Sequence, residues 1–344
     1  MRRIIEKSTL LLVLLVLFAC GSRNTTSLMK NVTGKAGELV IVIEKGIWDN
    51  GADSVLIHSL AQPQIGLPQE EPLFDLIHIP HEAFTSIFQT TRNLIVTDVN
   101  PSLDSTGVFY VKDRYARPQA FVSIKAKNTE ELLKLYNENS DNIIAFFLKA
   151  EKDRLMYSYA KYYDKAVFEQ ADKKFGIQIK VPPGFFIAKD TTNFMWIRYE
   201  TPEISQGIFI YTYPYVSDST FTTKYLTIQR NLFLKSNVPG PLLNGTFMTT
   251  EDAVPVFMTT LKKDGNFAAD LRGLWKVQDD FMGGPFVSLS IIDLLKKRVV
   301  TLDGFVYAPG KEKRNLLRQV EAIIYSVKFD DQIDMDKINQ QFAD

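Results

Sequence analysis

The sequence has a single cysteine, Cys20, and only three histidines among its 344 residues. One cysteine cannot form an intramolecular disulfide, so stability must come from packing. The 40 basic and 40 acidic residues balance to a formal net charge of zero, which favours no nucleic-acid partner. The sequence also lacks a zinc-helix signature, a phosphate loop, a dinucleotide glycine pattern and a G-x-S-x-G elbow. We therefore predict no cofactor and no metal; whether the protein is an enzyme stays open, with the balance of these signals against it.

The apolar run Leu10–Ala19 is too short to span a bilayer, which needs roughly 20 apolar residues. It follows the basic residues Arg2, Arg3 and Lys7 and stops at Cys20. This order of basic, apolar and cleavage regions is typical of a secretory signal peptide. We expect the run to be removed from the mature protein.

The end of this signal, Leu17-Phe18-Ala19-Cys20, resembles the lipobox of bacterial lipoproteins. The resemblance implies a diacylglyceryl thioether on Cys20, cleavage before it and acylation of its new amino group, which together give a stable membrane anchor. The alternative is an ordinary cleaved signal that leaves Cys20 as a free thiol. In the lipoprotein pattern an aspartate after the cysteine favours the inner membrane, and here that residue is Gly21. We expect an outer-membrane lipoprotein that faces the periplasm, with the cell surface as the alternative.

Loss of the signal removes three basic residues and one acidic residue, which leaves 37 basic and 39 acidic residues, a net charge of −2. With 45% hydrophobic residues and 24 phenylalanines, the remainder is predicted to be a folded globular protein.

We divide the chain into a signal peptide (1–19), a lipidated cysteine with a flexible tether (20–37), an N-terminal α/β half (38–140), a connecting long helix (141–175), a C-terminal antiparallel sheet with helices (176–330) and a polar tail (331–344).

The first half alternates between strand and helix patterns. The predicted elements are a buried strand at Glu38–Glu44, a helix at Asp53–Ala61, a strand at Leu73–Ile79, a helix at His81–Gln89 and a strand at Asn93–Val99. This order favours an α/β layer. An antiparallel pair, at Gly107–Lys112 and Gln119–Lys125, is expected to extend it into a mixed sheet.

From Ser140 to Phe175 no proline or glycine occurs and apolar residues recur at helical spacing, which predicts one long helix that ends at Gly176. After it, short strand patterns separated by turn residues, among them Phe194–Tyr199 and Val299–Tyr307, predict an antiparallel sheet. Helical patterns at Thr222–Lys235 and Glu312–Val327 are expected to cover it. The predicted fold class is α+β, with two α/β sandwich-like halves joined by the long helix.

Two stretches of the second half are candidates for a ligand or partner surface. On a strand, Phe209, Tyr211, Tyr213 and Tyr215 share one face, and Trp196 on a neighbouring strand extends the row. Such rings can stack on sugars or peptides, but the alternative is that they pack in the core under covering helices.

The second stretch contains Asp279-Asp280 and the pair Gly283-Gly284. Adjacent carboxylates can hold a cation or act as acid and base, and paired glycines allow backbone conformations that other residues resist. The alternative is a solvated turn.

His78, His81 and Glu82 offer the elements of a metal site. However, a strand that ends at Pro80 places the two histidines on different elements, so nothing fixes their convergence. We do not predict a metal site here.

The lipobox, the Glu38–Lys45 strand, the segment Pro72–Pro80 and the stretch Arg272–Phe286 together resemble a family of Bacteroidota lipoproteins, domain-of-unknown-function family 4837. The resemblance implies an envelope lipoprotein and supplies no catalytic residues. The second half also looks like the sheet-and-helix modules of the PsbP type, which are mostly accessory or binding proteins; this is an analogy of fold only.

The function expected from the sequence is that of a membrane-anchored, non-catalytic binding or accessory module with an envelope protein or glycan as its partner. One alternative is an envelope hydrolase that uses Asp279, Asp280 or Glu82 as acid and base. Another is a carrier of a small apolar ligand between the two halves.

Overall fold

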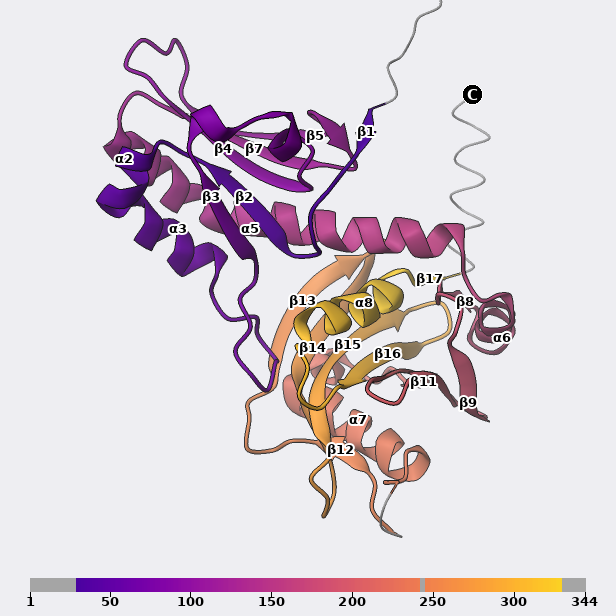
Figure 1. Cartoon of the computed structure of the whole chain (residues 1–344). Coiled ribbons are helices and arrows are strands. Elements are labelled where there is room, and N and C mark those ends of the chain that lie inside the picture. Colours follow the sequence, from indigo (N-terminus) through magenta and orange to yellow (C-terminus); the bar gives the residue numbers. More distant parts are fainter. Residues whose placement is uncertain (1–28, 242–244, 330–344) are drawn as a thin grey trace, which may run out of the picture.

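A computed structural model describes residues 29–241 and 245–329. The signal peptide, Cys20, the tether up to residue 28 and the polar tail lie outside the described residues. The described chain is an α+β fold with a mixed sheet in the first half, an antiparallel sheet in the second and a long helix between them, as the sequence predicts (Figure 1).

The first half is built on a sheet of five described strands. In sheet order these are β3 (Asp75–Ile79), β2 (Glu38–Val42), β4 (Asn93–Val99), β7 (Ala120–Ala126) and β5 (Gly107–Lys112). All neighbours are parallel except β5, which pairs antiparallel with β7. The predicted alternation of strand and helix is therefore confirmed.

Helices α3 (Asp53–Leu60) and α5 (Thr129–Lys161) cover one face of this sheet and bury Leu39, Ile41 and Ile95 from its strands. The opposite face is covered only in part. There the 3₁₀ turn η2 (His81–Ala83) and the short helix α4 (Ser86–Gln89) pack on Val40, Val42, Ile79, Leu94 and Phe121. The single helix predicted from 81 to 89 is interrupted because Phe84 leaves helical geometry at ψ 69°. The carboxyl ends of β4 and β7 are left open on this face.

The long helix differs from its prediction. α5 begins at Thr129, where the Asn128 side chain accepts a hydrogen bond from the backbone N–H of Glu131, and it runs through Ser140 without a break. It ends at Lys161, and a separate helix, α6 (Lys165–Phe175), begins after Asp164. The Asp164 side chain accepts the Val167 backbone N–H at 2.9 Å, so this residue caps a new helix and divides the predicted one.

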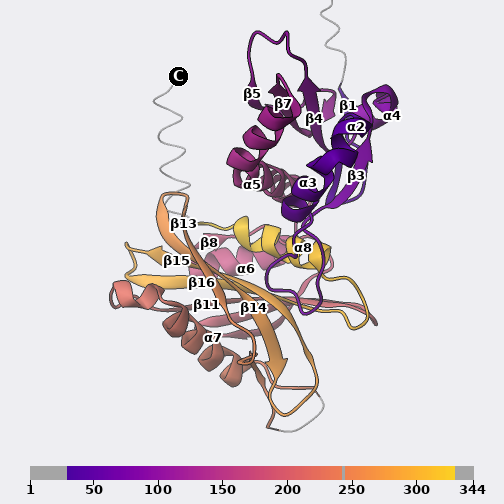
Figure 2. The same cartoon turned by 90° about the vertical axis from the view of Figure 1, so that its left-hand side faces the viewer.

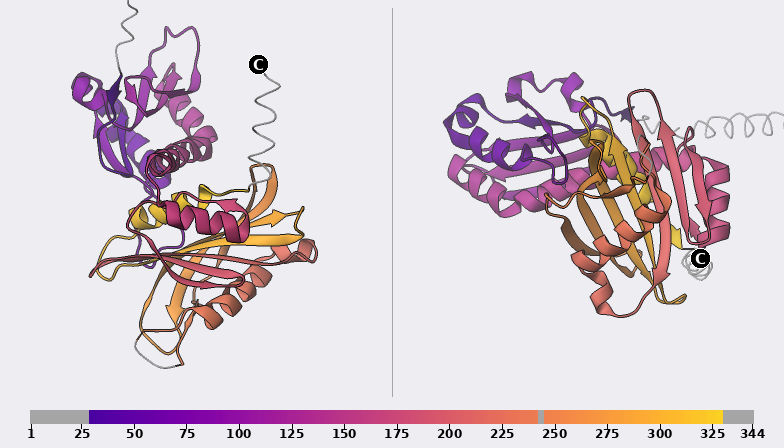
Figure 3. Two further views of the ribbon diagram at one scale, coloured as in Figure 1. Left: turned by 90° about the vertical axis from the view of Figure 1, so that its right-hand side faces the viewer. Right: turned by 90° about the horizontal axis from the view of Figure 1, so that it is seen from below.

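The second half is one antiparallel sheet of eight described strands. In sheet order these are β12 (Met248–Thr250), β14 (Asn266–Val277), β15 (Gly283–Asp293), β16 (Arg298–Tyr307), β11 (Ser205–Pro214), β10 (Phe194–Glu200) and β9 (Phe186–Thr191), with β13 (Phe257–Lys263) also paired to β14. Helices α6 and α8 (Arg314–Tyr325) pack on one face and α7 (Thr223–Asn237) on the other (Figure 3, left).

Short elements complete the described chain. They are β1 (Lys30–Asn31) with its partner β6 (Ala116–Arg117), α2 (Lys45–Ile47), the π-helical segment η1 (Trp48–Ala52), β8 (Ile177–Gln178) with its partner β17 (Lys328–Phe329), and the 3₁₀ turn η3 (Asp218–Phe221).

The two halves are joined by polar contacts as well as by α5, which passes over α8 (Figures 1 and 2). The Glu71 carboxylate of the first half accepts the backbone N–H groups of Lys313 at 2.6 Å and Arg314 at 2.8 Å, so it caps α8 of the second half. Arg314 in turn pairs with Asp75 at 2.7 Å, and Lys152 of α5 pairs with Glu321 of α8 at 2.7 Å. These contacts fix one half against the other.

Candidate functional site

A pocket of about 590 Å³ lies on the open face of the first sheet, above the carboxyl ends of its parallel strands. The chain leaves β2 toward β3 on one side and later enters β4 on the other, so the strand order reverses between β2 and β4. In open α/β sheets ligands bind at the carboxyl ends of the strands beside such a reversal. The pocket therefore occupies the place where this kind of sheet binds its ligand.

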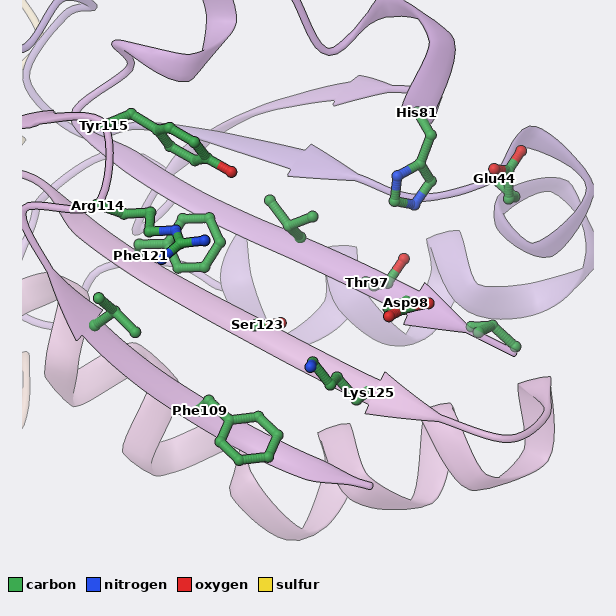
Figure 4. A pocket seen from close by; sticks show the side chains of 13 residues that line it. Glu44, His81, Thr97, Asp98, Phe109, Arg114, Tyr115, Phe121, Ser123 and Lys125 are labelled. Atoms are coloured by element: carbon green, nitrogen blue, oxygen red, sulfur yellow. The ribbon is translucent and has the colours of Figure 1, made fainter. Parts of the chain in front are cut away.

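The floor of the pocket is apolar and its rim is charged (Figure 4). The floor contains Val96, Val99, Phe109, Val111, Tyr115 and Phe121, and the polar lining contains Glu44, His81, Thr97, Asp98, Arg114, Ser123 and Lys125. The hydroxyl of Thr97 donates to the carbonyl oxygen of Val42 at 3.1 Å and so is already engaged. The Lys125 ammonium lies 5.8 Å from the Phe109 ring centre, within cation–π range.

The charges are separated along the pocket. Arg114 lies at one end, beside Tyr115, and its guanidinium carbon is 5.7 Å from the Tyr115 ring centre. Glu44 and His81 lie at the other end, with Asp98 and Lys125 nearer to them than to Arg114 (Figure 4). A ligand that spans the pocket meets Arg114 at one end and, at the other, the carboxylates of Glu44 and Asp98 with Lys125 beside them.

The candidate aromatic row lies between the second sheet and α7. Phe209, Tyr211 and Tyr213 are 0%, 1% and 7% exposed, and Phe233 of α7 stacks on Tyr211 at 4.4 Å between ring centres. Burial raises the pKa of Tyr213 to about 12. These three rings pack in the core, which was the alternative considered for them, and they present no open face to a ligand.

The ends of the row are less enclosed. Trp196 is half-buried against Phe209, and its indole Nε1 has no hydrogen-bond partner among the described residues. Tyr215 is half-buried and donates its hydroxyl to the Asp218 carboxylate at 2.7 Å. This hydrogen bond raises the pKa of Tyr215.

Asp279 and Asp280 lie in the turn between β14 and β15. Asp279 is exposed and has a left-handed backbone with φ 57°, while Asp280 accepts the Phe281 backbone N–H at 2.6 Å. Glu82, the third carboxylate of the hydrolase alternative, lies in η2 of the first half and outside this turn. The three groups do not form one site.

Gly283 and Gly284 have ordinary strand backbones, so the unusual conformation expected for them is absent. These glycines instead let neighbouring strands lie close together. A Cβ on Gly284 would lie 2.1 Å from the Val306 carbonyl oxygen, which accepts the indole N–H of Trp275. This packing explains why glycine is needed there.

The two candidate histidines, His78 and His81, have different surroundings. His78 stacks on Trp48 with ring centres 4.3 Å apart, and its Nε2 hydrogen-bonds the Ile43 carbonyl at 3.1 Å, whereas His81 lines the pocket. Among the described residues no group of three or more metal-ligating side chains converges. Cys20 lies outside them, and within them no helix is both long and apolar enough to cross a membrane.

The pocket residues were not identified from the sequence, although part of the signal was present. Glu44 and Asp98 stand at the carboxyl ends of two predicted strands, and the strand–helix order already implied that these ends meet. Lys125 reaches the pocket because β7 pairs with β4, which places it opposite Asp98, and Arg114 follows the edge strand β5. The sequence predicts the pairing of β5 with β7 but not the place of β7 beside β4.

Several solved structures are weakly similar to the chain. The Saccharomyces cerevisiae Ran-binding protein Mog1p is 9% identical, with 45% of this chain and 90% of that chain covered at a TM-score of 0.31. LpqN of Mycobacterium tuberculosis, described as involved in cell envelope biogenesis, is 12% identical, with 44% and 82% covered at a TM-score of 0.28. Scores this low carry no argument about function. No curated protein matches the sequence.

Family profiles match both halves. Residues 32–160 match Domain of unknown function (DUF8532), and residues 164–326 match Domain of unknown function (DUF4837). The boundary between them, residues 161–163, coincides with the break between α5 and α6. Each half therefore matches a profile of unknown function, and the profile that matches the second half is the one that the sequence resembles.

Proposed function

We propose that this protein is a lipid-anchored envelope lipoprotein that acts by binding a small ligand in the pocket of its first half. The anchor is Cys20, and the body faces the periplasm from the outer membrane. The lipobox Leu17–Cys20 and the signal pattern before it support the anchor. The pocket at the strand ends supports the binding role.

The charged residues at the two ends of the pocket also indicate which class of ligand it would bind. Arg114 can pair with a carboxylate of the ligand at one end. At the other end Glu44 and Asp98 can accept from an ammonium group, and with two carboxylates against the one cation Lys125 that end keeps an excess of negative charge. The apolar floor between them suits short side chains. This chemistry fits a zwitterionic short peptide, a class that the peptide components of an envelope supply.

Titration calorimetry with trialanine tests the binding role. We expect trialanine to bind, and its N-acetylated, C-amidated form to bind at least about tenfold more weakly because each lost ion pair costs 1.5–3 kcal/mol. Arg114→Gln and Asp98→Asn should each reduce trialanine affinity by about tenfold. Glu130→Gln, on an exposed turn of α5 outside the pocket, is the matched control. Equal binding of both peptides would contradict the proposal.

The anchor is tested by fractionation of cells that express the chain or its Cys20→Ala variant. We expect the unaltered chain in the outer-membrane fraction, labelled by a fatty acid, and the variant outside it. Crosslinking in the same two strains would recover an envelope partner only from the anchored form. An unaltered chain without lipid label would overturn the anchor and leave the pocket measurement unaffected.

A further inference from the structure

A groove of about 900 Å³ lies on the first half, between α5 and the strands β1 and β6 (Figure 1). Residues 146–161 of α5 form one wall, and the other contains Met29, Asn31 and residues of the segment 112–120. We call it the α5 groove. It shares no lining residue with the pocket at the strand ends, so it is a separate candidate site.

Part of the lining of this groove is apolar and accessible. Met29 and Tyr157 are 45% and 62% exposed, and Phe146 and Ala150 are partly exposed. The Lys161 ammonium lies 4.3 Å from the Tyr157 ring centre, which places a cation beside this apolar surface. An occupant with apolar side chains would remove this surface from water.

Two ion pairs at the groove are balanced. Arg117 lies 3.2 Å from Asp113, and Lys149 lies 2.6 Å from Asp153. Each cation has its own carboxylate, so these four residues add no net charge.

The other cations at the groove outnumber their carboxylates. Arg154 lies 2.8 Å from Glu151, but this buried carboxylate is shared with Arg92, at 3.0 Å. Lys112 and Lys161 form no ion pair within residues 29–241 and 245–329. Four cations therefore meet one carboxylate, and the excess of three positive charges favours an anionic occupant.

The residues that follow the last described strand have a complementary composition. Residues 330–344, which we call the acidic tail, contain five aspartates and one lysine, a net charge of −4. They also contain four large apolar side chains, those of Ile333, Met335, Ile338 and Phe342. The tail thus combines negative charge with apolar surface, whereas the groove combines positive charge with apolar surface.

The acidic tail begins near one end of the groove. Ser326, close to the last described residue, accepts the backbone N–H of Lys180 at 2.9 Å, and the Lys180 ammonium lies 3.8 Å from the Tyr163 ring centre. Tyr163 follows the groove residue Lys161 by two positions. The fully extended tail spans up to about 50 Å, whereas α5 rises about 22 Å along the groove. The tail is therefore long enough to reach the groove and to lie along it.

We propose that the acidic tail docks in the α5 groove of its own chain. Its aspartates pair with Lys112 and Lys161, and its apolar side chains cover Met29 and Tyr157. The opposite net charges favour this occupant, and covalent attachment supplies it at an effective concentration on the order of millimolar. The contact does not depend on the proposed function, because the groove and the pocket at the strand ends are separate.

Carbodiimide crosslinking of residues 21–344 tests the contact in the whole mature chain, because this reagent joins a lysine to an adjacent carboxylate without a spacer. In the monomer, we expect mass spectrometry to find tail aspartates joined to Lys112 and Lys161. The link between Lys149 and Asp153, which lie 2.6 Å apart, is the internal control. A chain that forms the control link but no tail link to Lys112 would overturn the proposal.

A synthetic peptide of residues 330–344 tests the same contact between molecules. Its binding partner is a chain in which Asp331→Asn, Asp334→Asn and Asp336→Asn weaken the resident tail. We expect calorimetry to show that the peptide binds this neutralised-tail chain at least about tenfold more tightly than the unaltered chain, where the resident tail competes. Equal binding to the two chains would count against the docked tail and refute the proposal.

Variants assign the peptide to the α5 groove. In the neutralised-tail chain, Lys112→Gln/Lys161→Gln should weaken peptide binding about tenfold, whereas Lys224→Gln, at an exposed position of α7, should not change it. A peptide with Ile338→Ser/Phe342→Ser keeps every charge and should also bind about tenfold more weakly. Peptide binding that survives Lys112→Gln/Lys161→Gln would contradict the proposal, as would a neutralised-tail chain that binds phosphatidylglycerol vesicles but not the peptide.

Discussion

Arg230 and Asp303 form a bidentate ion pair in the aromatic core beneath α7, where they are 1% and 0% exposed. The Arg230 guanidinium also lies 3.8 Å from the Phe286 ring centre and donates to Thr250 at 3.0 Å. Burial raises the pKa of Asp303, while attraction to Arg230 opposes this rise. Each charge is therefore stabilised in the core only while the other is present.

Removal of either partner should therefore be costly. We expect Arg230→Met or Asp303→Asn to lower the free energy of unfolding by about 3–5 kcal/mol, because a charge is left buried alone. The double variant Arg230→Met/Asp303→Leu should recover most of that loss, since no unpaired charge remains. Urea unfolding of the four proteins measures both effects, and a double variant as unstable as the singles would contradict this explanation.

A second prediction for a single residue concerns the stability of the protein at low pH. Burial would raise the pKa of Glu321, but Arg272 and Lys152 outweigh it and hold this pKa at about 2, below the ordinary 4.5. A lowered pKa in the folded state stabilises the protein above pH 4.5, and this stabilisation is lost as the pH falls toward 2.

Glu321→Gln should therefore remove part of the acid dependence. Between pH 5 and pH 3 its free energy of unfolding should fall less than that of the unaltered chain, by about 2 kcal/mol. Burial raises the pKa of the neighbouring Asp270, with the opposite sign, and the charge of Glu321 adds to this rise, so that part of the Asp270 contribution is lost in the variant. Urea unfolding at pH 5 and pH 3 gives the free energies of unfolding of both proteins. Equal losses in the two proteins would contradict this prediction.

At the scale of elements, Gly284 lets β15 lie close to the backbone of β16 and to the Trp275 side chain of β14. A Cβ on Gly284 would lie 2.1 Å from the Val306 carbonyl oxygen and 3.1 Å from the Trp275 indole nitrogen. We expect Gly284→Ala to destabilise the second sheet by about 3 kcal/mol or more, because backbone must move to admit the methyl group. Gly46→Ala is the control, since nothing lies within 4 Å of its added Cβ. Thermal unfolding that is unchanged by Gly284→Ala would disprove the packing role.

The strands of the second half were predictable because turn residues separate them. The sequence predicts strands at 194–199 and 299–307, and the structure has β10 at 194–200 and β16 at 298–307. The long helix was predicted less well, because apolar periodicity continues across its break. The cap at Asp164, a local signal, outweighs that periodicity.

Site prediction depends on contacts that a sequence does not display. The aromatic alternation of β11 was visible, but whether a helix covers that face depends on α7, which follows it in the chain. Similarly, Arg318 has an ordinary helical neighbourhood, and its hydrogen bonds to Gln64 and Leu73 form only where α8 meets the first half.

At the scale of the whole molecule, the halves are coupled through the amino end of α8. Glu71 caps this helix from the other half, and Arg314 bonds both Asp75 and the Pro72 carbonyl. Because these partners belong to different domains, the two domains should unfold together.

Calorimetric unfolding tests this coupling. We expect one transition for the unaltered chain and two separated transitions for Glu71→Ala/Arg314→Met, which removes the cap and the ion pair without touching either core. Lys45→Met, which breaks an exposed ion pair with Asp49, should leave one transition. Two transitions in the unaltered chain would show that the halves are independent.

The cap on α8 also has a consequence for the order of synthesis. A ribosome makes Glu71 early, but the backbone groups that it caps belong to residues 242 and 243 positions later. Until α8 is made, the first domain carries an unsatisfied carboxylate and the uncovered carbonyls of Pro72 and Leu73. A product that stops before residue 313 would expose this surface permanently and offer quality-control proteases a mark of an unfinished chain.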